Sequence, residues 1–193
     1  MNMAYDAMND SSDEDLLTLY ASGDQSAARE LMLRHAPRVL ALANRLLRDT
    51  AEAEDVTQEA MLRLWKIAPD WRTGEAKIST WLYRVASNLC TDRLRKRRGV
   101  GLDQAPEIAD ETPSVETVLM NADRGQALRI AIDKLPERQK LAIDLRHFQE
   151  LSNPEIGEIL ETSVEAVESL LSRARRSLAA DMEKHRAALG LAE

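Results

Sequence analysis

The segment that most constrains the fold lies in the middle of the chain. Residues 99–123 begin with two closely spaced glycines, contain two prolines, and carry six acidic and no basic side chains. Glycine and proline interrupt regular structure, and a run of like charges keeps a chain extended. We therefore predict an acidic, flexible linker here, between domains at residues 13–98 and 124–187. Residues 1–12 are expected to be a disordered N-terminus and residues 188–193 a short tail.

Composition predicts that both domains are helical. Hydrophobic residues make up 44% of the 193 residues, aromatic residues 4% and charged residues 31%, a profile that suits helices. The single cysteine excludes a disulfide framework and a thiolate-rich zinc site. No apolar run reaches the roughly 20 residues of a membrane span, and the acidic N-terminus is unlike a signal peptide. We expect an all-α, cytoplasmic protein of two small helical domains, without metal, cofactor or direct membrane insertion.

The charge distribution argues against independent DNA binding. The net charge is −7, yet acidic and basic stretches alternate, and residues 66–98 alone sum to +6. Phosphate neutralisation supplies most of the affinity of a free-standing DNA-binding protein, which is therefore usually basic. This chain should bind naked DNA weakly unless a partner carries it there.

Periodic apolar residues in the first domain predict three helices, each with one buried face. The predicted inner positions are Val39, Leu42, Ala43, Leu46 and Leu47, then Val56, Ala60, Met61 and Leu64, then Ile78, Leu82, Val85, Ala86 and Leu89. Asp49 should cap the middle helix. Opposite the buried face of that helix, the sequence places Asp55, Gln58, Glu59 and the apolar Leu62. A charged stripe is usually a solvated face, and the apolar residue within it points only weakly to a partner.

The third predicted helix starts near Ser79 and ends in a basic run at 93–98. Its outer face should carry Arg84, Ser87, Asn88, Thr91 and Arg95. Four of the seven aromatic residues lie between Trp65 and Tyr83, among basic residues. Proteins that hold single strands stack bases on aromatic rings while cations follow the backbone. Alternatively, Trp65 and Trp81 are core and the basic run is a solvated helix end. We prefer this interpretation for Trp65 but not for the outer stripe.

The second domain should contain four helices, near 125–134, 137–149, 153–160 and 164–183. The last two have helix-turn-helix spacing, and Gly157 would allow their close approach. An ordinary helical hairpin has the same pattern, so the spacing alone makes DNA binding about an even choice. The arginines of the last helix favour it, because guanidinium groups reach bases and phosphates.

Capping signals locate the ends of these last two helices. We expect Ser152 or Asn153 to cap the first of them. We expect Thr162 and Glu165 to form a capping box on the second.

Taken in order, these motifs resemble the extracytoplasmic-function group of bacterial sigma-70 factors, which give RNA polymerase its promoter specificity. Residues 54–65, EDVTQEAMLRLW, are similar to the polymerase-binding segment of the family. Residues 71–89 are similar to its promoter-melting and minus-ten segment, and LPERQ at 135–139, with the helix-turn-helix, to its minus-thirty-five domain. Three motifs in the family's order are far more specific than any one of them.

The resemblance implies a role for each motif. The residues implied to bind core RNA polymerase are Asp55, Gln58, Glu59 and Leu62. Those implied to contact the opened minus-ten strand are Trp71, Arg72, Arg84, Asn88 and Arg95. Of these, Trp71 and Asn88 would hold a flipped base. Those implied to face the minus-thirty-five duplex are Arg146, Glu168, Ser169, Ser172, Arg173 and Arg176. The family is usually inhibited by an anti-sigma protein, which is expected here by resemblance alone. The acidic net charge then fits, because such proteins reach promoter DNA as part of the polymerase.

The sequence departs from the family pattern in the helix-turn-helix. Glu161 stands in the turn where the family usually has glycine, which requires a strained non-glycine residue or a different turn. Where the family commonly has small, hydroxyl or basic residues, the recognition helix carries Glu165, Ala166, Glu168 and Leu170. Acidic residues beside phosphates should weaken binding, so we expect an unusual promoter or dependence on Arg173 and Arg176. Glu168 could instead accept a hydrogen bond from a cytosine amino group.

Other functions are less well supported. An enzyme is not expected, because the three histidines lie on separate elements and no phosphate-binding glycine loop or nucleophile motif is present. Cys90 is expected to be small and partly buried, with no second cysteine for redox sensing. The serious alternative is a stand-alone helix-turn-helix regulator that dimerises through its first domain and binds operators without polymerase. The acidic balance and the lack of an effector domain count against it.

Overall fold

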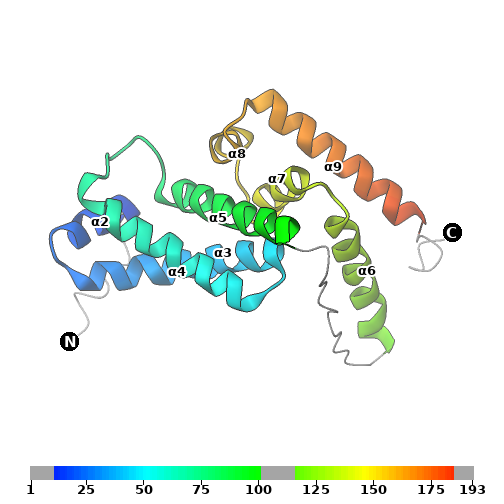
Figure 1. Ribbon diagram of the computed structural model, residues 1–193, viewed down its shortest axis with the longest axis horizontal. Coiled ribbons are helices and arrows are strands. Elements are labelled where there is room, and N and C mark those ends of the chain that lie inside the picture. Colours follow the sequence, from blue (N-terminus) through cyan, green and yellow to red (C-terminus); the bar gives the residue numbers. More distant parts are fainter. Residues whose placement is uncertain (1–10, 101–115, 185–193) are drawn as a thin grey trace. The chain divides into compact units, whose positions relative to one another are not determined.

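The computed structural model describes residues 11–100 and 116–184, and its regular structure there is entirely helical (Figure 1). This confirms the prediction of an all-α fold. The chain divides into two compact units, one of residues up to 100 and the other of most residues beyond. None of the described helices is both long and apolar enough to cross a membrane. The ends and most of the predicted linker, at 1–10, 101–115 and 185–193, lie outside the described residues.

The first unit is a bundle of helices with a short 3-10 turn. Its described elements are α2 (Asp13–Ala21), α3 (Gln25–Leu47), α4 (Thr50–Ile67), η1 (Ala68–Asp70) and α5 (Ile78–Val100). Helices α3, α4 and α5 pack on one another, and α2 packs against α3 and η1. All predicted inner positions of α3 and α4 are buried. Ser87, predicted on the outer face of α5, is buried, because α5 contacts both α3 and α4 and so buries more than one stripe.

A polar corner fixes α4 to the end of α3. Arg48 ends α3 in the left-handed conformation, with φ at 54°, and Asp49 caps α4 as predicted, accepting from the Glu52 N–H at 3.0 Å. Arg97 of α5 closes the corner. Its guanidinium donates to the Leu47 carbonyl at 3.0 Å and pairs with Asp49 and Glu52. Part of the basic run therefore has a structural role.

The second unit contains α6 (Glu116–Asp133), α7 (Glu137–His147), α8 (Asn153–Leu160) and α9 (Val164–Lys184). Helix α9 packs against α6 and α7. An ion pair of 2.9 Å joins Lys134, just after α6, to Asp181 of α9, and one of 3.0 Å joins Lys140 of α7 to Asp133 at the end of α6. Helix α6 begins earlier than its predicted start near 125, because the residues between Pro113 and Gly125 contain no helix breaker.

One of the two predicted caps of α8 is present. The Ser152 hydroxyl donates to a carboxylate oxygen of Glu155 at 2.7 Å, and that carboxylate accepts from the Ser152 N–H at 2.9 Å. This reciprocal arrangement satisfies donors that the first turn of a helix otherwise leaves open.

Candidate functional site

Four side chains of α4 form one surface, which we call the α4 stripe: Asp55, Gln58, Glu59 and Leu62. Positions three, four and seven residues apart return to the same face of a helix, so the structure brings these predicted residues together. Asp55, Gln58 and Leu62 are exposed and Glu59 is half-buried. Leu62 exposes 53% of its surface. The α4 stripe therefore offers carboxylates around an exposed apolar side chain.

Two arginines hold the carboxylates of the α4 stripe. Arg63 Nε lies 2.8 Å from Glu59 Oε1, and Arg93 Nη1 of α5 lies 3.7 Å from Asp55 Oδ2. A groove of about 580 Å³ runs along the stripe and is lined by residues of α4 and α5, including Lys96. Exposed ion pairs contribute about 0–1 kcal/mol. A partner with its own cations can therefore replace these arginines at low cost.

An apolar surface on α3 is absent from the sequence-based prediction. Met32 and Leu33 expose 46% and 60% of their surface. Met32 lines two grooves, of about 670 and 300 Å³, with Leu33 in the larger and Leu62 in the smaller. The α4 stripe thus continues onto α3. The available signal was that both residues lie off the helical spacing of the buried α3 residues.

Trp65, predicted to be a core residue, is only partly buried. It is half-buried at the end of α4, where its ring lies against Tyr20 of α2 with centroids 4.7 Å apart. It also lines the smaller groove. Its ring therefore serves both the packing of α2 and the exposed apolar surface.

The loop between η1 and α5, residues 71–77, carries Trp71 and Arg72. The Trp71 ring meets Trp81 edge-on, with centroids 6.0 Å apart and planes at 83°. Its indole nitrogen is buried and has no hydrogen-bond partner among the described residues. A buried donor without an acceptor is unfavourable. Arg72 is exposed, 3.4 Å from Glu75.

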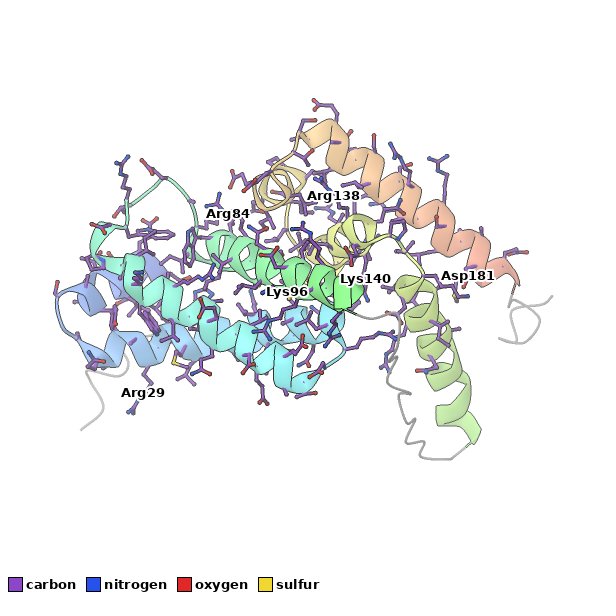
Figure 2. The ribbon with its side chains drawn as sticks, viewed as in Figure 1. Arg29, Arg84, Lys96, Arg138, Lys140 and Asp181 are labelled. Carbon is purple, nitrogen blue, oxygen red and sulfur yellow. The ribbon has the colours of Figure 1, made fainter. Side chains whose placement is uncertain are left out.

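The outer face of α5 carries the predicted basic stripe, although Ser87 is buried there and Thr91 is half-buried. Arg84, Asn88 and Arg95 are exposed. In Figure 2, Arg84 lies toward the N-terminal half of α5 and Lys96 toward its C-terminal end. Arg95 lies 3.4 Å from Asp92. Arg93 and Arg97 instead face α4, so the cations open to a nucleic acid on this helix are fewer than the sequence implied.

The turn between α8 and α9 is tight and strained. Glu161 has a φ of 50°, in the left-handed region that favours glycine, so the turn accepts strain rather than a different geometry. The Thr162 N–H donates to the Gly157 carbonyl at 2.9 Å. A Cβ atom at Gly157 would lie 2.9 Å from the Thr162 carbonyl oxygen. Glycine is therefore required for this close approach.

Ser163, rather than Thr162, caps α9. The Ser163 hydroxyl accepts from the Ala166 N–H at 3.3 Å, so the predicted capping box was wrong by one residue because the turn extends further. The Glu165 carboxylate accepts hydrogen bonds from its own backbone N–H and from Ser163, and these bonds lower its pKa. The start of α9 thus holds a carboxylate of this chain where a helix N-terminus would otherwise favour a phosphate.

The exposed face of α9 carries five of the six residues predicted to face the duplex. They are Glu168, Ser169, Ser172, Arg173 and Arg176. Val167, Leu171 and Ala174 are buried on the opposite side. The sixth predicted residue, Arg146, belongs to α7. Its Nη1 donates to the Leu151 carbonyl at 2.8 Å, which braces the loop before α8.

The histidine and cysteine side chains show no catalytic arrangement in the described part of the chain. No group of three or more His, Cys, Asp or Glu side chains there could hold a metal ion. His35 is buried, with Nε2 2.8 Å from Asp13 Oδ2. Cys90 is fully buried, deeper than the partly buried position expected.

Comparison with known proteins identifies the family of this chain. Residues 31–100 match the family model of Sigma-70 region 2, and residues 125–178 match that of Sigma-70 region 4. The ECF RNA polymerase sigma factor SigW of Bacillus subtilis is 32% identical over 167 residues, which are 81% of this chain and 89% of that protein. SigE of Mycolicibacterium smegmatis, also an ECF RNA polymerase sigma factor, is 34% identical over 172 residues, 86% of this chain and 66% of that protein.

Solved structures show the same fold. The structure of CnrH in complex with the cytosolic domain of CnrY superposes with a TM-score of 0.67 at 26% identity, over 90% of this chain and 99% of that one. The α4 stripe, the loop at 71–77 and the outer face of α5 all lie within the region 2 match. The exposed face of α9 lies within the region 4 match.

Proposed function

This chain belongs to the extracytoplasmic-function group of sigma-70 factors, and on that premise we propose that it binds core RNA polymerase, directs it to promoters and assists strand opening. It performs no chemical step of its own. The observation that carries this proposal is the α4 stripe, where exposed Leu62 lies among carboxylates inside the region 2 match. A solvated helix face needs no exposed leucine beside grooves lined by further apolar residues.

Core polymerase binding is assigned to the α4 stripe and the adjoining α3 surface. The carboxylates of Asp55 and Glu59 suit a basic partner surface, and Leu62 with Met32 adds apolar contact. Electrostatic complementarity of this kind sets the orientation and rate of association, and burial of the apolar groups sets much of the affinity. Because the carboxylates already lie beside Arg63 and Arg93, they are held in place before the partner arrives.

Recognition of the opened minus-ten strand is assigned to the loop at 71–77 and the outer face of α5. Trp71 supplies an aromatic ring that is half-exposed, and Asn88 supplies an exposed amide. Arg72, Arg84 and Arg95 supply cations for the backbone. Flipping a base out of a duplex costs a few kcal/mol, which stacking and hydrogen bonding at such a site offset.

Recognition of the minus-thirty-five duplex is assigned to the exposed face of α9. Arg173 and Arg176 carry its positive charge, while Glu165 and Glu168 oppose phosphate binding. Weak binding of α9 alone to the duplex fits a protein that reaches DNA as part of the polymerase. Sequence preference then depends on the two arginines, the two serines and Glu168, with cytosine a possible partner for the carboxylate.

Regulation by an anti-sigma protein fits the same surfaces. The relative CnrH was solved with the cytosolic domain of CnrY. In this chain the apolar side chains of α3 lie next to the α4 stripe, so one bound protein could cover both and block the polymerase. The protein would act in the cytoplasm, associated with the nucleoid when bound to polymerase.

The test is co-elution of the purified chain with bacterial core RNA polymerase on a sizing column. The wild type should co-elute, and an Asp55→Lys/Glu59→Lys variant should not. A Glu165→Lys/Glu168→Lys variant makes the same change of charge on α9 and should still co-elute. If the folded wild type fails to co-elute and instead selects an operator from naked DNA, the stand-alone regulator replaces this proposal.

A further inference from the structure

The loop at 71–77 is held by a residue that lies far away in the sequence. Glu14, in the first turn of α2, accepts a hydrogen bond from the Gly74 N–H through its Oε1 atom at 3.0 Å, across 60 residues of chain. Helix α2 also packs against η1, which leads directly into this loop. The N-terminal helix therefore contacts both the entry of the loop and its middle.

The first turn of α2 is itself firmly fixed. Asp13 pairs with Arg34 at 3.1 Å and with His35 at 2.8 Å, and Arg34 also donates to the Ser11 carbonyl at 2.8 Å. A capping box between Ser12 and Asp15 holds the same turn. Glu14 thus projects from a backbone anchored to α3, and it can hold the loop in place relative to the core of this unit.

Gly74 depends on such an external contact because packing does not fix it. Its φ is 84°, in the left-handed region, and a Cβ atom built on it would meet nothing within 4 Å. Open surroundings leave the backbone of the loop free to change conformation. Trp71 is held by its own contact with Trp81, so the hydrogen bond to the anchored carboxylate acts on the part of the loop that follows it, at Gly74.

We infer that Glu14 is a positioning residue for promoter opening: it holds the loop at Gly74 in the conformation that receives the unpaired strand, without touching DNA. This rests on the proposed function of the loop. The length of the Glu14 side chain is the property that matters, because its acceptor oxygen must extend from α2 to the Gly74 N–H. Charge matters less, since an amide oxygen at the same place can accept the same bond.

Three variants of the full chain, each assembled with core polymerase, separate reach from charge. Glu14→Gln keeps the acceptor and loses the charge, Glu14→Asp keeps the charge and shortens the reach, and Glu14→Ala loses both. The probe is a promoter recovered with the wild-type holoenzyme, carrying 2-aminopurine in the minus-ten strand to report opening. Glu14→Ala and Glu14→Asp should lower the opening equilibrium about fivefold, the effect of one net hydrogen bond. Glu14→Gln should stay within about twofold.

Three further readouts distinguish positioning from a general structural role. Affinity for core polymerase should be equal in all four proteins. The melting temperature of the first unit should fall in Glu14→Ala and Glu14→Asp by no more than about 4–8 °C, the effect of one hydrogen bond. Protection of the Gly74 amide from hydrogen exchange should fall in Glu14→Ala and Glu14→Asp and persist in Glu14→Gln.

Several results would overturn the inference. Opening by Glu14→Ala equal to that of the wild type would do so, as would a parallel loss of core affinity. A larger opening equilibrium with Glu14→Gln than with the wild type would show that the carboxylate repels the DNA strand instead of holding the loop. Failure of the wild type itself to assemble with core polymerase would overturn the proposed function, and the inference with it.

Discussion

Replacing Gly157 with alanine should destabilise the helix-turn-helix. The added Cβ would lie 2.9 Å from the Thr162 carbonyl oxygen, whereas ordinary van der Waals contact begins at 3.4 Å. The obstructing atom belongs to the backbone of a turn that already holds Glu161 in the left-handed region. The turn must therefore move outward by about 0.5 Å, which strains the hydrogen bond from the Thr162 N–H to the Gly157 carbonyl.

The magnitude follows from three terms. Overpacking of this kind costs about 1–3 kcal/mol, and a weakened hydrogen bond adds up to about 1 kcal/mol. Alanine returns about 0.8–1.0 kcal/mol through its higher helix propensity. The free energy of unfolding should fall by about 0–3 kcal/mol, centred on about 1.5 kcal/mol. That central value lowers the melting temperature of a domain this small by about 6–12 °C.

Gly125 provides the matched control. It also lies in a helix, α6, but a Cβ there meets nothing within 4 Å. Gly125→Ala should therefore stabilise the second unit by about 0.5–1 kcal/mol. The same substitution is predicted to have opposite signs at two positions of one unit.

Circular dichroism and tryptophan fluorescence together make the assay specific. All three tryptophans lie in the first unit, so their fluorescence reports that unit, whereas helical dichroism reports both. Gly157→Ala should shift the dichroism transition and leave the fluorescence transition in place. Equal stability of the Gly157→Ala and Gly125→Ala proteins would refute the steric argument.

Two other outcomes follow from charges in the structure. Glu165→Ala should tighten binding of the holoenzyme to every minus-thirty-five duplex severalfold, most at low salt, because it removes a carboxylate from the start of α9. Glu168→Lys should instead change which duplex sequence is preferred. A uniform gain in affinity with Glu168→Lys would contradict a role of Glu168 in base recognition. Fluorescence anisotropy on a set of duplexes measures both. The hydrogen bond from His35 and the pairing with Arg34 lower the pKa of Asp13. Its ionised form therefore stabilises the fold above the usual pKa of an aspartate, about 3.9, and this contribution is lost as the pH falls through the lowered value. Asp13→Asn should be less stable than the wild type at neutral pH, with a gap that closes in acid, as measured by urea unfolding; a gap independent of pH would contradict this cause.

Local periodicity was sufficient to predict much of this protein. The buried faces of α3 and α4 follow the 3.6-residue spacing of their apolar residues, and the α4 stripe lies opposite. Spacing also identified Gly157 as a point of close approach. These features depend on neighbours within one or two helical turns, which the sequence states directly.

The sequence-based predictions were wrong where tertiary packing decides which side chains are buried and which partners they contact. Ser87 is buried because α5 packs against two helices, and a single amphipathic stripe does not describe such a helix. The basic run divides because Arg93 and Arg97 turn toward α4, a choice set by residues more than 35 positions earlier. The bond between Glu14 and Gly74 likewise needs the folded unit. Linear patterns specify faces of helices but not their long-range partners.

The central claim is tested most directly by mapping the 5′ ends of RNA made by core polymerase on genomic DNA, with and without this chain. A new set of start sites should appear only with the chain and share upstream sequence elements at the minus-ten and minus-thirty-five positions. The Asp55→Lys/Glu59→Lys protein should produce none of them. An unchanged set of start sites, with a folded chain that binds its own operator without polymerase, would contradict the account.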